Sequence, residues 1–342
     1  MDYGLEIANS VYRLMQRPVG LLSTHLFGNM KLLTLFIAFL ASTSVARTNH
    51  LVRVVTLTQD KLRAEAGEPL LKLTLYRLNA AAKAFRPDIV CLPETFSRGE
   101  AEPVPGLTTD RLADWARQHR CWVICPLTTR LEEKTYNSAV VLNRDGEIVG
   151  RYDKIRPTEN ELKKSICPGP DQPPVFETEF GKIGVQICFD VNWTEQWRTL
   201  RNQGAKIIFF PSAYPAARQL RSLAWQNQCF IVSATKNRSA AIYDITGDSI
   251  DQSGHYRPWA QAVLPVGKRL FETDYNVHKM RAIERDHGER VRIQWFHDDA
   301  LITLESHDPQ LTVDSLIKKY ELTPHTVYLR RTEQAQEEKR DQ

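Results

Sequence analysis

The chain has 342 residues, of which 42% are hydrophobic and 25% are charged, so it can form one large globular domain or two smaller ones. Its 45 basic and 41 acidic side chains are spread along the sequence and give a formal net charge of +4, which argues against a nucleic acid partner. The nine His residues lack the spacing of metal ligands, so no metal is expected. No other cofactor is expected either.

The amino-terminal part contains a predicted export signal. Met30 and Lys31 precede an apolar run over residues 32–41, and residues 42–46 end in the small-x-small pattern that signal peptidase recognises. The run is shorter than the roughly 20 residues that span a bilayer, so we predict cleavage after Ala46 and no stable membrane span. Residues 1–29 are too long and too weakly basic for an ordinary leading segment, which suggests that translation starts at Met30.

Export would make the protein secreted or periplasmic. The alternative is a cytoplasmic protein in which residues 32–41 form a buried amino-terminal helix. In an oxidising compartment, a reactive thiol would have to survive without a disulfide partner.

From residue 51 onward, short apolar runs alternate with amphipathic segments, which is typical of an α/β fold. Strands are predicted over residues 52–57, 88–92, 122–126, 137–142, 147–152, 182–187, 207–211, 230–234, 260–265 and 291–295. Helices are predicted over residues 69–85, 109–118, 194–203, 218–228 and 313–320. The fourth and fifth strands should form a hairpin, and residues 156–174, rich in Pro, Gly and charge, an irregular loop.

These elements suggest a main domain over residues 47–268 and a carboxyl-terminal extension over residues 269–330. The extension is expected to pack on the main domain or on a partner subunit. Residues 331–342 are charged and lack apolar periodicity, so this tail is predicted to be frayed.

The six cysteines lie mostly inside apolar runs and are expected to be buried, unpaired thiols. Cys121 and Cys125 should share one face of a strand, where a disulfide or metal role is the less favoured interpretation.

Three polar residues follow or close predicted strands. Cys188 comes directly after the strand over residues 182–187 and precedes a helix, whose amino-terminal N–H groups could face a thiolate or an oxyanion. Alone, such a cysteine is more often inert packing. Glu94 ends a second apolar strand, where a carboxylate is costly unless it is paired or reactive, and Lys154 closes a third. A carboxylate, a positive charge and a thiol together are what thiol-mediated acyl transfer requires.

These segments resemble the Glu-Lys-Cys triad of the nitrilase superfamily, the carbon–nitrogen hydrolases, from about Val52 to at least Tyr256. The resemblance rests on ordered motifs at residues 92–94 (Leu-Pro-Glu), 152–154 (Tyr-Asp-Lys), 167–169 (Cys-Pro-Gly), 181–190 (Gly-Lys-Ile-Gly through Cys-Phe-Asp) and 204–214 (Gly-Ala-Lys-Ile through Pro-Ser-Ala-Tyr). It implies a four-layer α-β-β-α sandwich with two central mixed sheets, and pairing of subunits into a homodimer or a higher homo-oligomer.

The resemblance implies that Cys188 attacks the substrate carbon, that Glu94 exchanges protons, and that Lys154 and the N–H of Phe189 stabilise the oxyanion. A second glutamate helps to hold such sites. Glu161 fits this role better than Glu159, although its register is off by about one residue.

Substrate contacts are expected from Phe189, Trp193 and Tyr214, although an aromatic residue at position 214 could equally belong to the core or to a dimer interface. The Cys-Phe-Asp sequence at residues 188–190 resembles the amidase and carbamoylase branches, so a small amide or N-carbamoyl substrate is expected. Nitrile hydrolysis fits less well. An N-acyltransferase with the same triad and a non-catalytic binding relative are the alternatives from other classes.

Overall fold

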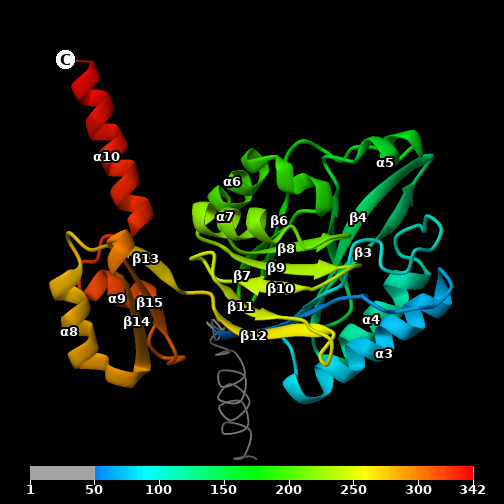
Figure 1. Ribbon diagram of the computed structural model, residues 1–342, viewed down its shortest axis with the longest axis horizontal. Coiled ribbons are helices and arrows are strands. Elements are labelled where there is room, and N and C mark those ends of the chain that lie inside the picture. The colour runs from blue at the N-terminus through cyan, green and yellow to red at the C-terminus, as the bar shows by residue number, and fades with distance from the viewer. Residues whose placement is uncertain (1–50, 342) are drawn as a thin grey trace, which may run out of the picture. The chain divides into compact units, whose positions relative to one another are not determined.

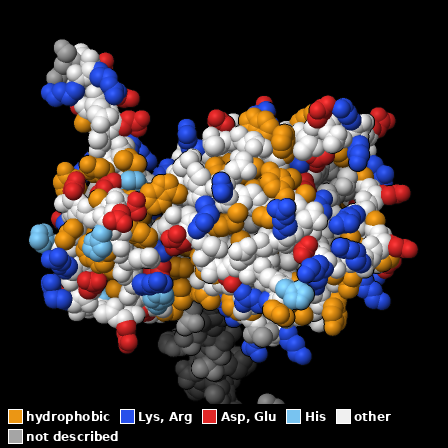
Figure 2. Space-filling model, in the orientation of Figure 1, with side chains coloured by type: hydrophobic (Ala, Val, Ile, Leu, Met, Phe, Trp, Pro, Cys, Tyr) orange, Lys and Arg blue, Asp and Glu red, His pale blue; other side chains and the backbone are white. Residues whose placement is uncertain are grey.

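The structure, a computed structural model, describes residues 51–341, all of which belong to one compact unit. The predicted signal over residues 30–46 lies outside the described residues, so export stays a prediction. Within residues 51–341, no helix is both long and apolar enough to cross a membrane. Basic and acidic side chains are mixed over the visible face, as the balanced composition implies (Figure 2).

Two six-stranded sheets form the centre of the fold (Figure 1). The first has the order β12-β1-β2-β3-β4-β5, in which β1, β2 and β3 are parallel and the hairpin partners β4 and β5 are antiparallel. Its strands are β1 (Leu51–Leu57), β2 (Ile89–Cys91), β3 (Trp122–Leu131), β4 (Lys134–Leu142), β5 (Ile148–Asp153) and β12 (Trp259–Pro265).

The second sheet has the order β11-β10-β9-β8-β7-β6, with β7, β8 and β9 parallel at its centre. Its strands are β6 (Val175–Thr178), β7 (Gly181–Val185), β8 (Ala205–Ser212), β9 (Phe230–Thr235), β10 (Ala241–Tyr243) and β11 (Ser249–Gln252). Both sheets are therefore mixed, as expected.

Three apolar clusters join four layers. Strand β1 shows how: Val52 and Val54 pack in the cluster between the two sheets, whereas Val55 and Leu57 pack against helices on the outer face. Helices α3 (Glu68–Phe85) and α4 (Leu107–His119) cover the first sheet, and helices α6 (Thr194–Asn202) and α7 (Ala217–Asn227) cover the second. The four-layer α-β-β-α sandwich is confirmed.

The carboxyl-terminal extension has a small sheet of its own, in the order β13-β15-β14. Its elements are β13 (Arg269–Glu272), α8 (Val277–His287), β14 (Val291–Phe296), β15 (Leu301–Ser306) and α9 (Val313–Lys319), which share a separate apolar cluster. Buried Lys268 joins this extension to the main domain, since its Nζ lies 2.5 Å from Asp244 Oδ2 and 3.2 Å from Glu305 Oε2.

Two segments differ from the sequence expectations. The charged tail is not frayed through its length, because helix α10 (His325–Arg340) includes most of it. None of its residues is buried, so its helicity reflects the good helix formers Arg, Gln, Glu and Lys rather than an apolar face. The loop over residues 156–174 contains a short helix, α5 (Glu159–Lys163), which Thr158 caps.

Trp197 offers a test of this layering, because it is completely buried between α6 and the second sheet and packs against Phe210. We expect Trp197→Ala to lower the free energy of unfolding by about 3–5 kcal/mol, since a large cavity would remain. The control is Tyr76→Ala on α3, where the side chain is 73% exposed and the expected loss is about 0.5 kcal/mol or less. Urea unfolding followed by circular dichroism measures both, and equal losses would contradict the packing.

Candidate active site

The predicted site residues come from the ends of three strands in two different sheets. Glu94 follows β2 and Lys154 follows β5 in the first sheet, whereas Cys188 follows β7 in the second. Because the two sheets pack face to face, these ends meet across the apolar cluster that joins them. The structure therefore brings the three residues together, as the sequence predicted.

Lys154 lies at the centre of a buried charge cluster. Its side chain is 1% exposed, and its Nζ lies 3.0 Å from Glu94 Oε1 and 2.8 Å from Glu161 Oε2. The side-chain amide of Asn137, on β4, donates to the same two carboxylates, at 2.8 Å to Glu94 and 2.7 Å to Glu161. Each carboxylate thus has an ion pair and a hydrogen bond, which offsets its loss of water.

Helix α5 places one of the two candidate glutamates, Glu161, beside Lys154 and the other, Glu159, at the surface. The Thr158 hydroxyl accepts from the backbone N–H of Glu161, and Glu161 Oε2 accepts in return from the N–H of Thr158 at 2.7 Å. This reciprocal cap turns the Glu161 carboxylate toward Lys154. Glu159 instead is exposed and pairs with Lys163.

Cys188 begins a 3-10 turn, η1 (Cys188–Asn192), with a φ of 48°, which is a left-handed conformation that few non-glycine residues adopt. Asp190 holds this turn. Its carboxylate accepts from the N–H of Ile187 at 2.8 Å, from the Tyr152 hydroxyl at 2.7 Å and from the N–H of Arg156 at 2.9 Å. The turn that carries the thiol is therefore attached to the segment that carries Lys154.

Burial and charge control the proton affinities in the site. Burial and the nearby Glu94 carboxylate raise the pKa of the Cys188 thiol to about 11, although Lys154 and hydrogen bonds from Ala213 and Ser212 oppose the increase. Burial opposes the charge on Lys154, but Glu94, Cys188 and Glu161 outweigh it and raise the pKa of the ammonium above its usual value. The resting thiol is therefore protonated at neutral pH.

Two residues that contact Glu94, Asn137 and Lys236, were not predicted from the sequence. Asn137 lies in the middle of a strand, where nothing marks it as a bridge between two carboxylates. Lys236 follows β9, and its Nζ lies 3.8 Å from Glu94 Oε2 and 3.0 Å from the Thr95 hydroxyl. Its position after another parallel strand was the available signal, because such strand ends gather at one edge.

The three predicted substrate contacts come from two segments near the thiol: Phe189 and Trp193 belong to the turn that Cys188 begins and to its end, and Tyr214 comes shortly after Ser212 at the end of β8. The rings of Phe189 and Trp193 meet edge to face at 5.2 Å, and the guanidinium of Arg156 lies 5.3 Å from the Trp193 ring centre. Tyr214 is partly exposed and lines a pocket of about 700 Å³ with Ala213, the residue whose N–H faces Cys188. Their contact with a substrate stays a prediction.

The remaining cysteines are free, and Cys121 and Cys125 share the sheet face that packs on α3 and α4. Among residues 51–341, no group of three or more His, Cys, Asp or Glu side chains is placed to hold a metal ion.

The charges around Cys188 predict opposite pH shifts for two variants. Glu94→Gln removes a negative charge that raises the thiol pKa, so the pH midpoint of Cys188 alkylation by iodoacetamide should fall. Lys154→Met removes an opposing positive charge, so the midpoint should rise. Peptide mass spectrometry can follow Cys188 separately from the other cysteines. Shifts of the same sign in both variants would contradict this electrostatic description.

The chain is similar to several known proteins. A chain similar to this one is the omega-amidase NIT2 of Xenopus tropicalis, which is 28% identical over 204 residues, covering 52% of this chain and 72% of the relative. Among solved structures, Nit3 of Saccharomyces cerevisiae, a member of the nitrilase superfamily, has a TM-score of 0.57 at 18% identity, covering 70% of this chain and 95% of Nit3.

A mutant of the amidase from Nesterenkonia sp. AN1, solved with the acetamide moiety of fluoroacetamide covalently added at its active site cysteine, has a TM-score of 0.55 at 19% identity, covering 69% of this chain and 96% of the amidase. These likenesses show the fold. The carbon-nitrogen hydrolase family model matches residues 51–264, which include Glu94, Lys154 and Cys188, and the chain therefore belongs to the carbon–nitrogen hydrolase family.

Proposed function

We propose that this carbon–nitrogen hydrolase cleaves a small amide or N-carbamoyl compound through a thioester on Cys188. The observation that carries the proposal is the buried arrangement of one ammonium, Lys154, between the carboxylates of Glu94 and Glu161, beside a protonated thiol. It supplies a base, a fixed positive charge and a nucleophile in one place.

The reaction begins with transfer of the Cys188 proton to Glu94 as the sulfur attacks the carbonyl carbon of the substrate. Glu94 Oε1 already accepts from Lys154 and Asn137, which leaves Oε2 for proton exchange. The tetrahedral oxyanion is stabilised by the Lys154 ammonium and the N–H of Phe189. Glu94 then returns the proton to the departing nitrogen, so ammonia or an amine leaves and a thioester remains.

Water then hydrolyses the thioester, and Glu94 again acts first as a base and then as an acid. Glu94 takes a proton from water, whose oxygen attacks the thioester carbon, and the second tetrahedral oxyanion is stabilised by the same donors. Collapse expels the Cys188 sulfur, which regains the proton from Glu94, and the free acid leaves. One water is consumed, and the enzyme returns to its initial protonation state.

Glu161 and Asn137 serve this chemistry by keeping Lys154 charged and in place. In the resting enzyme two carboxylates surround the buried ammonium, and Glu161 stays ionised beside it while Glu94 carries the proton, so Lys154 remains positively charged. Glu161 is therefore assigned a positioning role, because it reaches the reacting atoms only through Lys154.

The choice of an amide or N-carbamoyl substrate over a nitrile rests on two supports. Relatives of this chain are named as an omega-amidase and, at 34% identity over 119 residues, as the beta-ureidopropionase of Arabidopsis thaliana. The sequence after the nucleophile, Phe189 and Asp190, resembles the amidase and carbamoylase branches. A panel of small amides such as butyramide, N-carbamoyl compounds and nitriles, assayed for ammonia release, would identify the substrate class.

Substitution of the three central residues tests their roles. We expect Cys188→Ala to abolish ammonia release, and Glu94→Gln and Lys154→Met each to lower kcat by about 10³-fold or more, since the groups act as one unit. The matched control is Cys167→Ala, which replaces the partly exposed cysteine outside the site and should retain activity. Circular dichroism would verify folding. Full turnover in Cys188→Ala would rule out the thioester route.

The fate of the acyl group separates hydrolysis from transfer. With a small amine added in excess, we expect the free acid to remain the main product, because the thioester is expected to react with water that Glu94 activates. Chromatography of the products gives the partition ratio. A dominant N-acyl product would instead assign the protein to the acyltransferases.

A further inference from the structure

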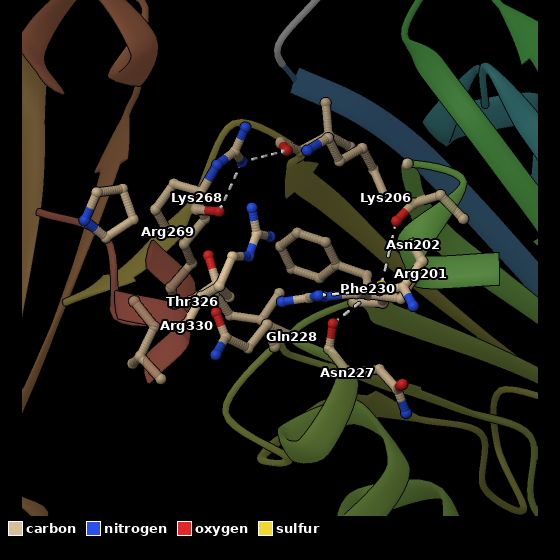
Figure 3. A pocket seen from close by; sticks show the side chains of 17 residues that line it. Arg201, Asn202, Lys206, Asn227, Gln228, Phe230, Lys268, Arg269, Thr326 and Arg330 are labelled. Atoms are coloured by element: carbon tan, nitrogen blue, oxygen red, sulfur yellow. Dashed lines mark hydrogen bonds between the residues drawn. The ribbon is translucent and has the colours of Figure 1, made fainter. Parts of the chain in front are cut away.

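A second cavity lies far from Cys188, at the amino-terminal ends of the parallel strands in the second sheet (Figure 3). It has a volume of about 250 Å³ and is bordered by Ala205, where β8 begins, and Phe230, where β9 begins. Ser212, which hydrogen-bonds the thiol, ends the same strand, about 23 Å away along β8. The cavity is therefore separate from the candidate active site.

Two parts of the chain contribute its walls. Arg201 and Lys206 come from the main domain, at the end of α6 and on β8, whereas Arg269 and Arg330 come from β13 and α10 of the extension. Figure 3 shows the side chains of Arg201 and Arg330 reaching into the space between these elements. A molecule bound here would touch both parts at once.

The cavity is strongly cationic. Five lining residues are Lys or Arg and none is Asp or Glu: the cations are Arg201, Lys206, Lys268, Arg269 and Arg330. Two of these charges are compensated elsewhere, since Lys268 pairs with buried carboxylates and Arg269 lies 3.4 Å from the exposed Asp314. Within residues 51–341, the other three form no ion pair.

The cations also repel one another. Burial and the charges of Arg269 and Arg201 lower the pKa of Lys206, although Asp314 opposes the decrease. Like charges held together around a partly enclosed space raise its positive potential, and a multivalent anion would relieve that repulsion.

We propose that this cavity binds a small multivalent oxyanion, of which a phosphate group is the best match. Guanidinium groups present paired N–H donors to phosphate oxygens, and Arg201 and Arg330 bring two of them to the cavity from different elements. The third lining guanidinium, that of Arg269, already donates to the carbonyls of residues 266–268 and pairs with Asp314, so it contributes less. The Thr326 hydroxyl and the side-chain amide of Gln228 also lie at its wall.

An adjoining groove provides room for an organic substituent on the phosphate. It has a volume of about 620 Å³, shares Arg201 and Arg330 with the cavity and adds Arg198, with Glu333 as its one acidic lining residue. The site therefore suits inorganic phosphate or the phosphate end of a larger metabolite. Bound there, the anion would link the extension to the main domain.

The test measures anion binding to the full chain by calorimetry and by the shift in Tm, at constant ionic strength. Inorganic phosphate, pyrophosphate and a small phosphomonoester, glycerol 3-phosphate, are compared with chloride. We expect the phosphate compounds to bind and raise Tm while chloride does not. Tighter binding of the phosphomonoester than of inorganic phosphate would assign the groove to an organic substituent, and the reverse order would assign the site to the free ion.

Matched variants locate the binding. The double variant Lys206→Gln, Arg330→Gln should weaken phosphate binding tenfold or more. The control is the double variant Lys318→Gln, Arg285→Gln, which removes the same charge from exposed positions in the extension. This control should bind phosphate as tightly as the unaltered chain. If the first double variant does not fold, Arg330→Gln alone replaces it, because that side chain lies on an exposed helix. Cys188→Ala should bind phosphate as the unaltered chain does. Equal affinity in the cavity and control variants, or equal stabilisation by chloride, would overturn the proposal.

Discussion

The burial of Lys154 between two carboxylates is the constraint on which the rest of the site depends. Moving one ammonium and two carboxylates out of water costs roughly several kcal/mol per ion, and only close pairing offsets that cost. The geometry supplies the pairing, with contacts of 3.0 and 2.8 Å and the Asn137 amide bridging both carboxylates. Lys236, 3.8 Å from the far oxygen of Glu94, brings the cluster of two carboxylates closer to neutrality.

No single sheet carries all three predicted catalytic residues, so the site depends on the packing of the two sheets. Glu94 and Lys154 belong to the first sheet and Cys188 to the second, so the apolar packing between the sheets sets their separation. Asp190 adds a polar connection, since its carboxylate joins the turn of Cys188 to Tyr152 and Arg156. Burial raises the pKa of Asp190 to about 6, so this connection is anionic at neutral pH.

The sequence predicted most of the parts that have a strong local pattern. Parallel strands such as β1 and β9 are mostly apolar, and Glu94, Lys154 and Cys188 each come shortly after a strand, which is why they could be found. Asn137 could not be found, because a polar residue within a strand gives no sign of what lies opposite it in the fold. Helix α10 was missed because its stability comes from good helix formers rather than from a buried face. The cationic cavity joins residues more than 100 positions apart, so only the fold reveals it.

The central claim is that Cys188 carries the acyl group during amide cleavage. The most direct measurement is acid quenching of the enzyme during turnover of an active amide, followed by proteolysis at low pH and mass spectrometry of the cysteine-containing peptides. The account predicts a mass increase equal to the acyl group on the peptide that contains Cys188 and on no other cysteine. Continued turnover with Cys188 unmodified, or with the acyl group on a different residue, would contradict it.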